Sequence, residues 1–92
     1  MVKLIEVRRR LDTGYSLAEI YVNPEHVVAI REDGGTAKSL REGKLPDGLS
    51  ENQTFTRLYI DRGQTGLDVT VVGHVELIRE KLGIARRTLL KG

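Results

Sequence analysis

The chain has 92 residues, of which 39% are apolar and 30% are charged, with a formal net charge of +2 at pH 7. This length and this even mixture of charges predict a single small folded domain over residues 1–92, not a disordered chain. The absence of cysteine excludes a disulfide framework, a thiolate nucleophile and a cysteine-based zinc site.

The apolar residues form neither a membrane-spanning run nor a secretory signal stretch. The apolar runs are far too short to span a bilayer, and the first residues include Lys3 and Glu6 instead of an apolar signal stretch. We therefore expect a cytoplasmic protein that does not insert into membranes.

The first third of the chain reads as three strands. Apolar and polar residues alternate over 2–8 and 17–22, and the turn signal at 12–14 separates these two strands. Asn23-Pro24 then interrupts the pattern, because proline lacks the amide proton that a central strand needs. Residues 24–26 are predicted to form a tight turn or a bulge before a third strand over 27–31. A one-turn helix over 24–27, capped by Asn23, is the alternative.

A long polar segment follows at about 33–54. Its apolar periodicity is poor, so a helical turn over 36–41 is the weaker interpretation, and we predict a mobile loop. Loops of this length inside a compact domain are usually functional or disordered. The segment is therefore the expected partner-facing element.

The clearest pattern lies in the last forty residues. Strands are predicted over 56–61 and 67–72, joined by the turn 62–66, and a helix over 74–82 that ends at Gly83. Val75, Ile78 and Leu82 are spaced as one stripe of that helix. Residues 84–92 are predicted to form a short basic tail or a brief second helical piece.

These elements predict an α+β fold: a small, mostly antiparallel sheet of four to five strands, with the 74–82 helix across one face. Exposed sheet edges make the pairing of two copies an accessible route to a homodimer. The helix is expected to contact apolar residues from every strand, namely Leu4, Val7, Ile20, Val22, Val28, Ile30, Leu58, Ile60, Val69 and Val71.

No group of residues predicts catalysis, and we expect neither an enzyme nor a bound cofactor. The three serines lie in turn-like contexts, outside any Gly-x-Ser-x-Gly motif. His26 and His74, with Asp61 or Asp68, could be drawn as a two-histidine, one-carboxylate site. Their spacing matches no recognised ligand pattern, so we expect no metal, and we expect His74 to be a helix cap or a surface side chain.

Binding of single-stranded nucleic acid is the main alternative function. Such proteins combine a positive groove with aromatic side chains on a sheet. The small net charge supplies little long-range attraction, however, and Phe55 and Tyr59 are also needed for the core, so solvated surface charge is the favoured interpretation. The candidate nucleic-acid contacts are Arg8, Arg9, Arg10, Arg57, Tyr59, Arg86 and Arg87.

Three local features stand out together: Met1-Val2-Lys3-Leu4-Ile5, the Asn-Pro-acidic string within 22–30, and two later strands followed by a short helix. In these features the chain resembles the small flagellar and swarming-motility proteins of the FlbD type. The segments at 8–14, at 33–54 and at the C-terminus depart from that pattern, and so does Gly73-His74 before the helix. The resemblance implies a non-enzymatic bacterial accessory or regulatory protein that acts through an unidentified protein partner.

Overall fold

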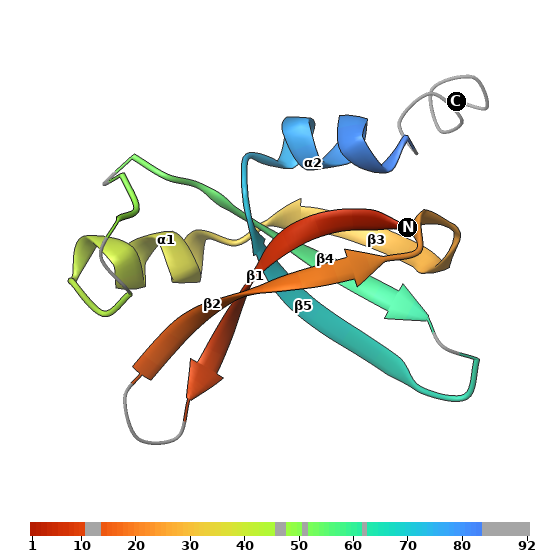
Figure 1. Ribbon diagram of the computed structural model, residues 1–92, viewed down its shortest axis with the longest axis horizontal. Helices are drawn as coiled ribbons and strands as arrows, with labels where there is room; N and C mark the ends of the chain where they lie inside the picture. Colours follow the sequence, from red (N-terminus) through yellow and green to blue (C-terminus); the bar gives the residue numbers. More distant parts are fainter. Residues whose placement is uncertain (11–13, 46–47, 51, 62, 84–92) are drawn as a thin grey trace.

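The structure is a computed structural model that describes residues 1–10, 14–45, 48–50, 52–61 and 63–83 (Figure 1). It confirms the predicted α+β class, with a five-stranded antiparallel sheet and a C-terminal helix. The strands lie in the order β2-β1-β5-β4-β3. The elements along the chain are β1 (Val2–Arg10), β2 (Gly14–Val22), the 3-10 turn η1 (Pro24–His26), β3 (Val27–Glu32), α1 (Gly34–Arg41), β4 (Phe55–Asp61), β5 (Gly66–Val72) and α2 (Val75–Leu82).

The sheet consists of two arms that meet at a short junction. Strands β1 and β2 pair over their full length, from Val2 opposite Val22 to Arg10 opposite Gly14. Strand β1 pairs with β5 only through Glu6–Val71 and Val7–Thr70. Beyond that junction the β1–β2 hairpin and the β4–β5 hairpin diverge, as Figure 1 shows.

The two edge strands, β2 and β3, follow each other in the chain and are joined through η1. The Asn23 side chain accepts a hydrogen bond from the Glu25 amide at 3.0 Å, and Pro24 occupies the first position of the turn. Asparagine is a favoured capping residue, and proline loses no hydrogen bond at this position. The short helical alternative is therefore the one observed.

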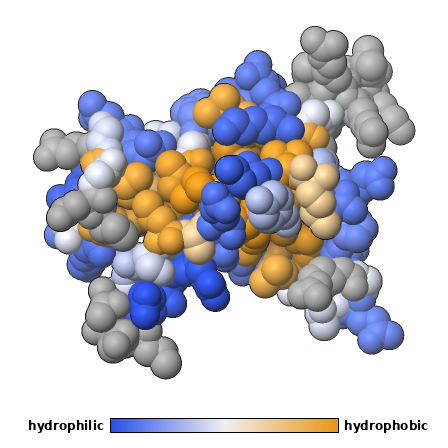
Figure 2. All heavy atoms as spheres, in the orientation of Figure 1, coloured by the Kyte–Doolittle hydropathy of each residue, from blue (hydrophilic) through white to orange (hydrophobic). Residues whose placement is uncertain are grey.

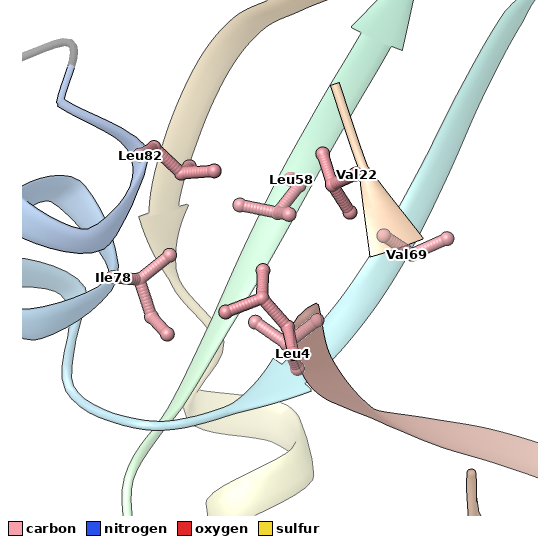
Figure 3. Close-up of a cluster of buried hydrophobic side chains, with 7 residues drawn as sticks. Leu4, Val22, Leu58, Val69, Ile78 and Leu82 are labelled. Carbon is pink, nitrogen blue, oxygen red and sulfur yellow. The ribbon is translucent and has the colours of Figure 1, made fainter. Parts of the chain in front are cut away.

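Helix α2 packs on one face of the sheet and forms the main core with it (Figure 3). Ile78 and Leu82 supply the buried part of the predicted helix stripe, while Val75 is half-buried. In Figure 3 the labelled side chains of α2 and of the strands β1, β2, β4 and β5 lie together between the helix and the sheet. The buried members of this cluster are Leu4, Val22, Leu58, Val69, Val71, Ile78 and Leu82.

Two residues predicted to contact α2 lie elsewhere. The register between β3 and β4 shifts between Val27 and Ala29, and this β-bulge leaves Val28 66% exposed. Val7 packs in a second cluster, because successive side chains of a strand point to opposite faces of the sheet. The prediction that both belong to the core under α2 is wrong.

The second cluster lies beneath α1 and the chain that follows it. Its buried residues are Val7, Leu45 and Phe55, and half-buried side chains of α1, including Leu40, pack against them. Apolar residues reach the surface in two areas of the view in Figure 2, one of them on the α1 side. This cluster fastens the segment after β3 to the sheet.

The segment predicted as a loop at about 33–54 begins instead with helix α1, so the prediction is wrong over Gly34–Arg41. Asp33 caps the helix, and the apolar residues that anchor it come from distant strands. Local periodicity could not reveal those anchors. Among the described residues, neither helix has the length and apolar character needed to cross a bilayer.

Candidate functional site

Within the described residues, the most connected polar side chain is that of Asp33, which is buried at the start of α1. Its carboxylate accepts hydrogen bonds from the Thr36 amide at 3.0 Å and from the hydroxyls of Thr36 and Thr70 at 3.0 and 2.8 Å. Burial acts to raise the pKa of Asp33, but these hydrogen bonds and the charge of Arg57 outweigh it and hold the pKa below its ordinary value. The network fastens α1 to β5 and has the character of a structural anchor.

Arg57, one of the candidate nucleic-acid contacts, takes part in that anchor. Its guanidinium lies 3.4 Å from Asp33 and 3.6 Å from Asp68. The charge of Asp33 is the main cause that raises the pKa of Arg57. The carboxylates of Asp33 and Asp68 therefore neutralise the positive charge of Arg57, which would otherwise attract a phosphate.

The junction of the two arms contains a hollow of about 280 Å³. Arg8 and Arg9 lie on its wall together with Arg57, so the fold brings three of the candidate arginines together although β5 separates their strands. The acidic side chains of Glu6 and Asp68 line the same hollow. Its charges are therefore nearly balanced.

The remaining candidate contacts are spread over the molecule. Arg10 is exposed at the end of β1, and Tyr59 is covered by the guanidinium of Arg31, which lies 5.5 Å from the ring centroid. Phe55 is fully buried and offers no stacking platform. The candidates Arg86 and Arg87, and the rest of the 84–92 tail, lie outside the described residues.

An apolar hollow of about 440 Å³ lies where the β-bulge of β3 meets the ends of β4 and β5. Val28 is 66% exposed there and Leu67 is 42% exposed. We call this set of residues the bulge surface: Val28, Tyr59, Ile60, Asp61, Gly66, Leu67 and Asp68.

A neighbouring hollow of about 600 Å³ extends the bulge surface toward η1, because Val28 and Asp61 line both. It adds Glu25 and His26 to the rim. The combined lining joins the apolar side chains of Val28, Ile60 and Leu67 to the carboxylates of Glu25 and Asp61. Sequence reasoning missed it, since it placed Val28 in the core; the only local signal was the Asn-Pro break just before β3.

The two histidines occupy different places and different roles. His26 lies in η1. His74 is the N-cap of α2, and its Nδ1 accepts a hydrogen bond from the Glu76 amide at 3.1 Å. The predicted capping role of His74 is confirmed. Within the described residues, no three side chains of the metal-binding types are grouped closely enough to hold an ion.

Comparison with protein-family models, with curated proteins and with solved structures finds no match for this chain.

Proposed function

We propose that this chain is a non-enzymatic bacterial accessory or regulatory protein that acts by binding another protein. The observation that carries the proposal is the bulge surface, on which Val28 of β3 and Leu67 of β5 are both exposed together with acidic residues. Exposed apolar groups with a polar rim are typical of protein-binding sites. The FlbD-like strings favour the same class of function, and no catalytic role or cofactor is part of the proposal.

The chemistry of the bulge surface defines the kind of partner it fits. Val28 and Leu67 offer apolar contact, while the carboxylates of Asp61 and Glu25 stand at the rim. A segment that presents an apolar side chain next to a lysine or arginine would complement both features. We therefore propose a partner with a basic, apolar docking segment.

Substitutions on the bulge surface test this function. Val28→Asp and Leu67→Glu should each weaken partner binding about tenfold or more, because each removes an apolar contact worth roughly 1.5–3 kcal/mol. The measurement is quantitative capture from a lysate of the source bacterium by the full chain. Leu77→Glu is the matched control, since Leu77 is 47% exposed on α2 and lines neither hollow.

The expected partner is enriched by the wild type and by Leu77→Glu, and lost with both bulge-surface variants. Its docking segment, prepared as a peptide, should then bind the purified chain with the same pattern of losses. If no captured protein follows this pattern, the bulge surface is not the binding site.

A second candidate function, binding of single-stranded nucleic acid, is favoured by the shared position of Arg8, Arg9 and Arg57. We expect the wild type to bind single-stranded DNA no more tightly than roughly 10⁻⁴ to 10⁻⁶ M near physiological salt. The carboxylates beside these arginines compensate their charge. Fluorescence anisotropy of labelled single-stranded DNA, measured across a salt series, gives the dissociation constant and its salt dependence. Sub-micromolar binding that is salt-sensitive and lost on replacing Arg8, Arg9 and Arg10 with alanine would establish the second function instead.

A further inference from the structure

The two edges of the sheet differ in how they are protected against pairing with another strand. Edge strand β3 has six residues, contains the bulge and ends in the charged residues Arg31 and Glu32. Short length, bulges and charges are the usual devices that blunt a sheet edge. Strand β3 is therefore a poor template for another strand.

Edge strand β2 lacks these devices. It has nine residues in regular register with β1, contains no proline and has one charged residue, Glu19. No backbone hydrogen bond in the described part of the chain joins its outer edge to another segment. Its unpaired amide and carbonyl groups can receive a further strand.

The side chains along β2 also leave apolar surface open. Leu17 and Tyr21 share one face with Glu19, and they are 37% and 61% exposed. The Glu19 carboxylate lies 3.4 Å from the Lys3 ammonium group of β1, so the two charges form an ion pair. The face next to this edge is thus mainly apolar.

We propose that β2 pairs in antiparallel fashion with β2 of a second copy of this chain, about a two-fold axis at Ala18, to form a continuous ten-stranded sheet. The inference rests on the proposed function, because it makes a second copy one of the protein partners, but it uses a different surface. Ala18 is the middle residue of the strand, so this register pairs all nine residues.

The sequence of β2 is self-complementary in this register. Tyr15, which also packs against the second cluster of its own copy, lies opposite the partner's Tyr21 at each end of the paired strands. Leu17 lies opposite the partner's Glu19, and no two like charges of the strands face each other. Moving the axis to Glu19 would set it against the partner's Glu19. The axis at Ala18 is therefore favoured.

A pair of substitutions at one position tests the register. Leu17→Glu places two carboxylates opposite each other at both symmetry-related positions, and should raise the dimer dissociation constant about tenfold or more. Leu17→Lys removes the same leucine but faces the partner's Glu19 with the opposite charge, and should leave the dimer intact. Exchanging the charges in Leu17→Glu with Glu19→Lys should restore it. Sedimentation velocity of the full chain measures all four proteins.

A crosslink provides an independent measurement. The chain has no cysteine, so Ala18→Cys introduces a single thiol at the axis, where opposed Cα atoms are about 4.5–5.5 Å apart and within disulfide reach. Oxidation should give a covalent dimer, while Leu77→Cys on α2 should form no covalent dimer under the same conditions, because its thiol lies away from the axis.

A wild type that remains monomeric at roughly 100 μM would overturn the inference, as would equal losses with Leu17→Glu and Leu17→Lys. Leu67→Glu should leave the dimer unchanged, and Leu17→Glu should leave capture of the other partner unchanged. Failure of one proposal is thus distinguishable from failure of the other.

Discussion

Replacing Phe55 with alanine is expected to lower the free energy of unfolding by about 3–5 kcal/mol, which for a domain of this size approaches complete loss of the fold. The side chain is fully buried between the sheet and α1, where it contacts Val7 and Leu45. Its removal leaves a cavity beneath the helix that the strands cannot close. Urea unfolding monitored by circular dichroism measures the loss.

Tyr59→Ala is the matched control, because Tyr59 lies on the same face of β4 but is only half-buried. It should cost much less than Phe55→Ala. Amide hydrogen exchange should also become faster in α1 of the Phe55 variant than in α2, which packs in the other cluster. A loss below about 1 kcal/mol would show that α1 is not held by this core.

Replacing Asp33 with alanine is expected to lower the free energy of unfolding by about 2–3 kcal/mol. The substitution removes the cap of α1 and leaves the Thr70 hydroxyl and Arg57 without their carboxylate partner. Asp33→Asn keeps a capping oxygen but loses the charge, so its cost should be about half as large. Thr36→Ala, which removes one hydroxyl hydrogen bond to the carboxylate, is the smaller control. Urea unfolding near pH 7 ranks the three variants.

The difference in stability between wild type and Asp33→Asn should depend on pH in a defined direction. The folded chain holds the pKa of Asp33 below its ordinary value of 3.8. The contribution of the carboxylate to stability is therefore fully present above pH 3.8 and is lost as the pH falls through the folded-state pKa. The stability gap between wild type and Asp33→Asn should shrink over that acidic range. A gap that stays constant would mean that the charge of Asp33 contributes nothing.

The parts of the fold that could be predicted are those specified locally. Helix α2 is predicted by the spacing of Ile78 and Leu82 and by Gly83 at its end. Gly83 is the C-cap and adopts the left-handed conformation, with φ of 69°. The strands follow from alternation, and Asn23-Pro24 supports the one-turn helix over 24–27 that stood as the alternative to a tight turn or bulge. Each of these features depends on residues within one or two turns of the chain.

The parts that could not be predicted depend on distant residues. Helix α1 has only Ala37 and Leu40 as an apolar stripe, and it is stabilised by Phe55 and by the Thr70 hydrogen bond to Asp33. The only local hint was Asp33 followed three residues later by Thr36, a capping pattern.

The candidate sites were hidden for the same reason. Exposure of Val28 arises from a shift of register between two strands, and the sequence of either strand alone does not contain that information. The grouping of Arg8 and Arg9 with Arg57 requires the junction of β1 with β5, which are joined only in the folded sheet.

The short β1–β5 junction has a consequence for the order in which the chain folds. Three of the four strand pairings in the described sheet join strands that are neighbours in the chain; β1 with β5 alone brings together opposite ends. Closing a long loop costs entropy before its contacts form, so pairings of this kind set the folding rate. The hairpins can assemble early and independently. The encounter of Glu6-Val7 with Thr70-Val71 then commits the chain to its native topology, although it contributes the fewest residue pairs to the sheet.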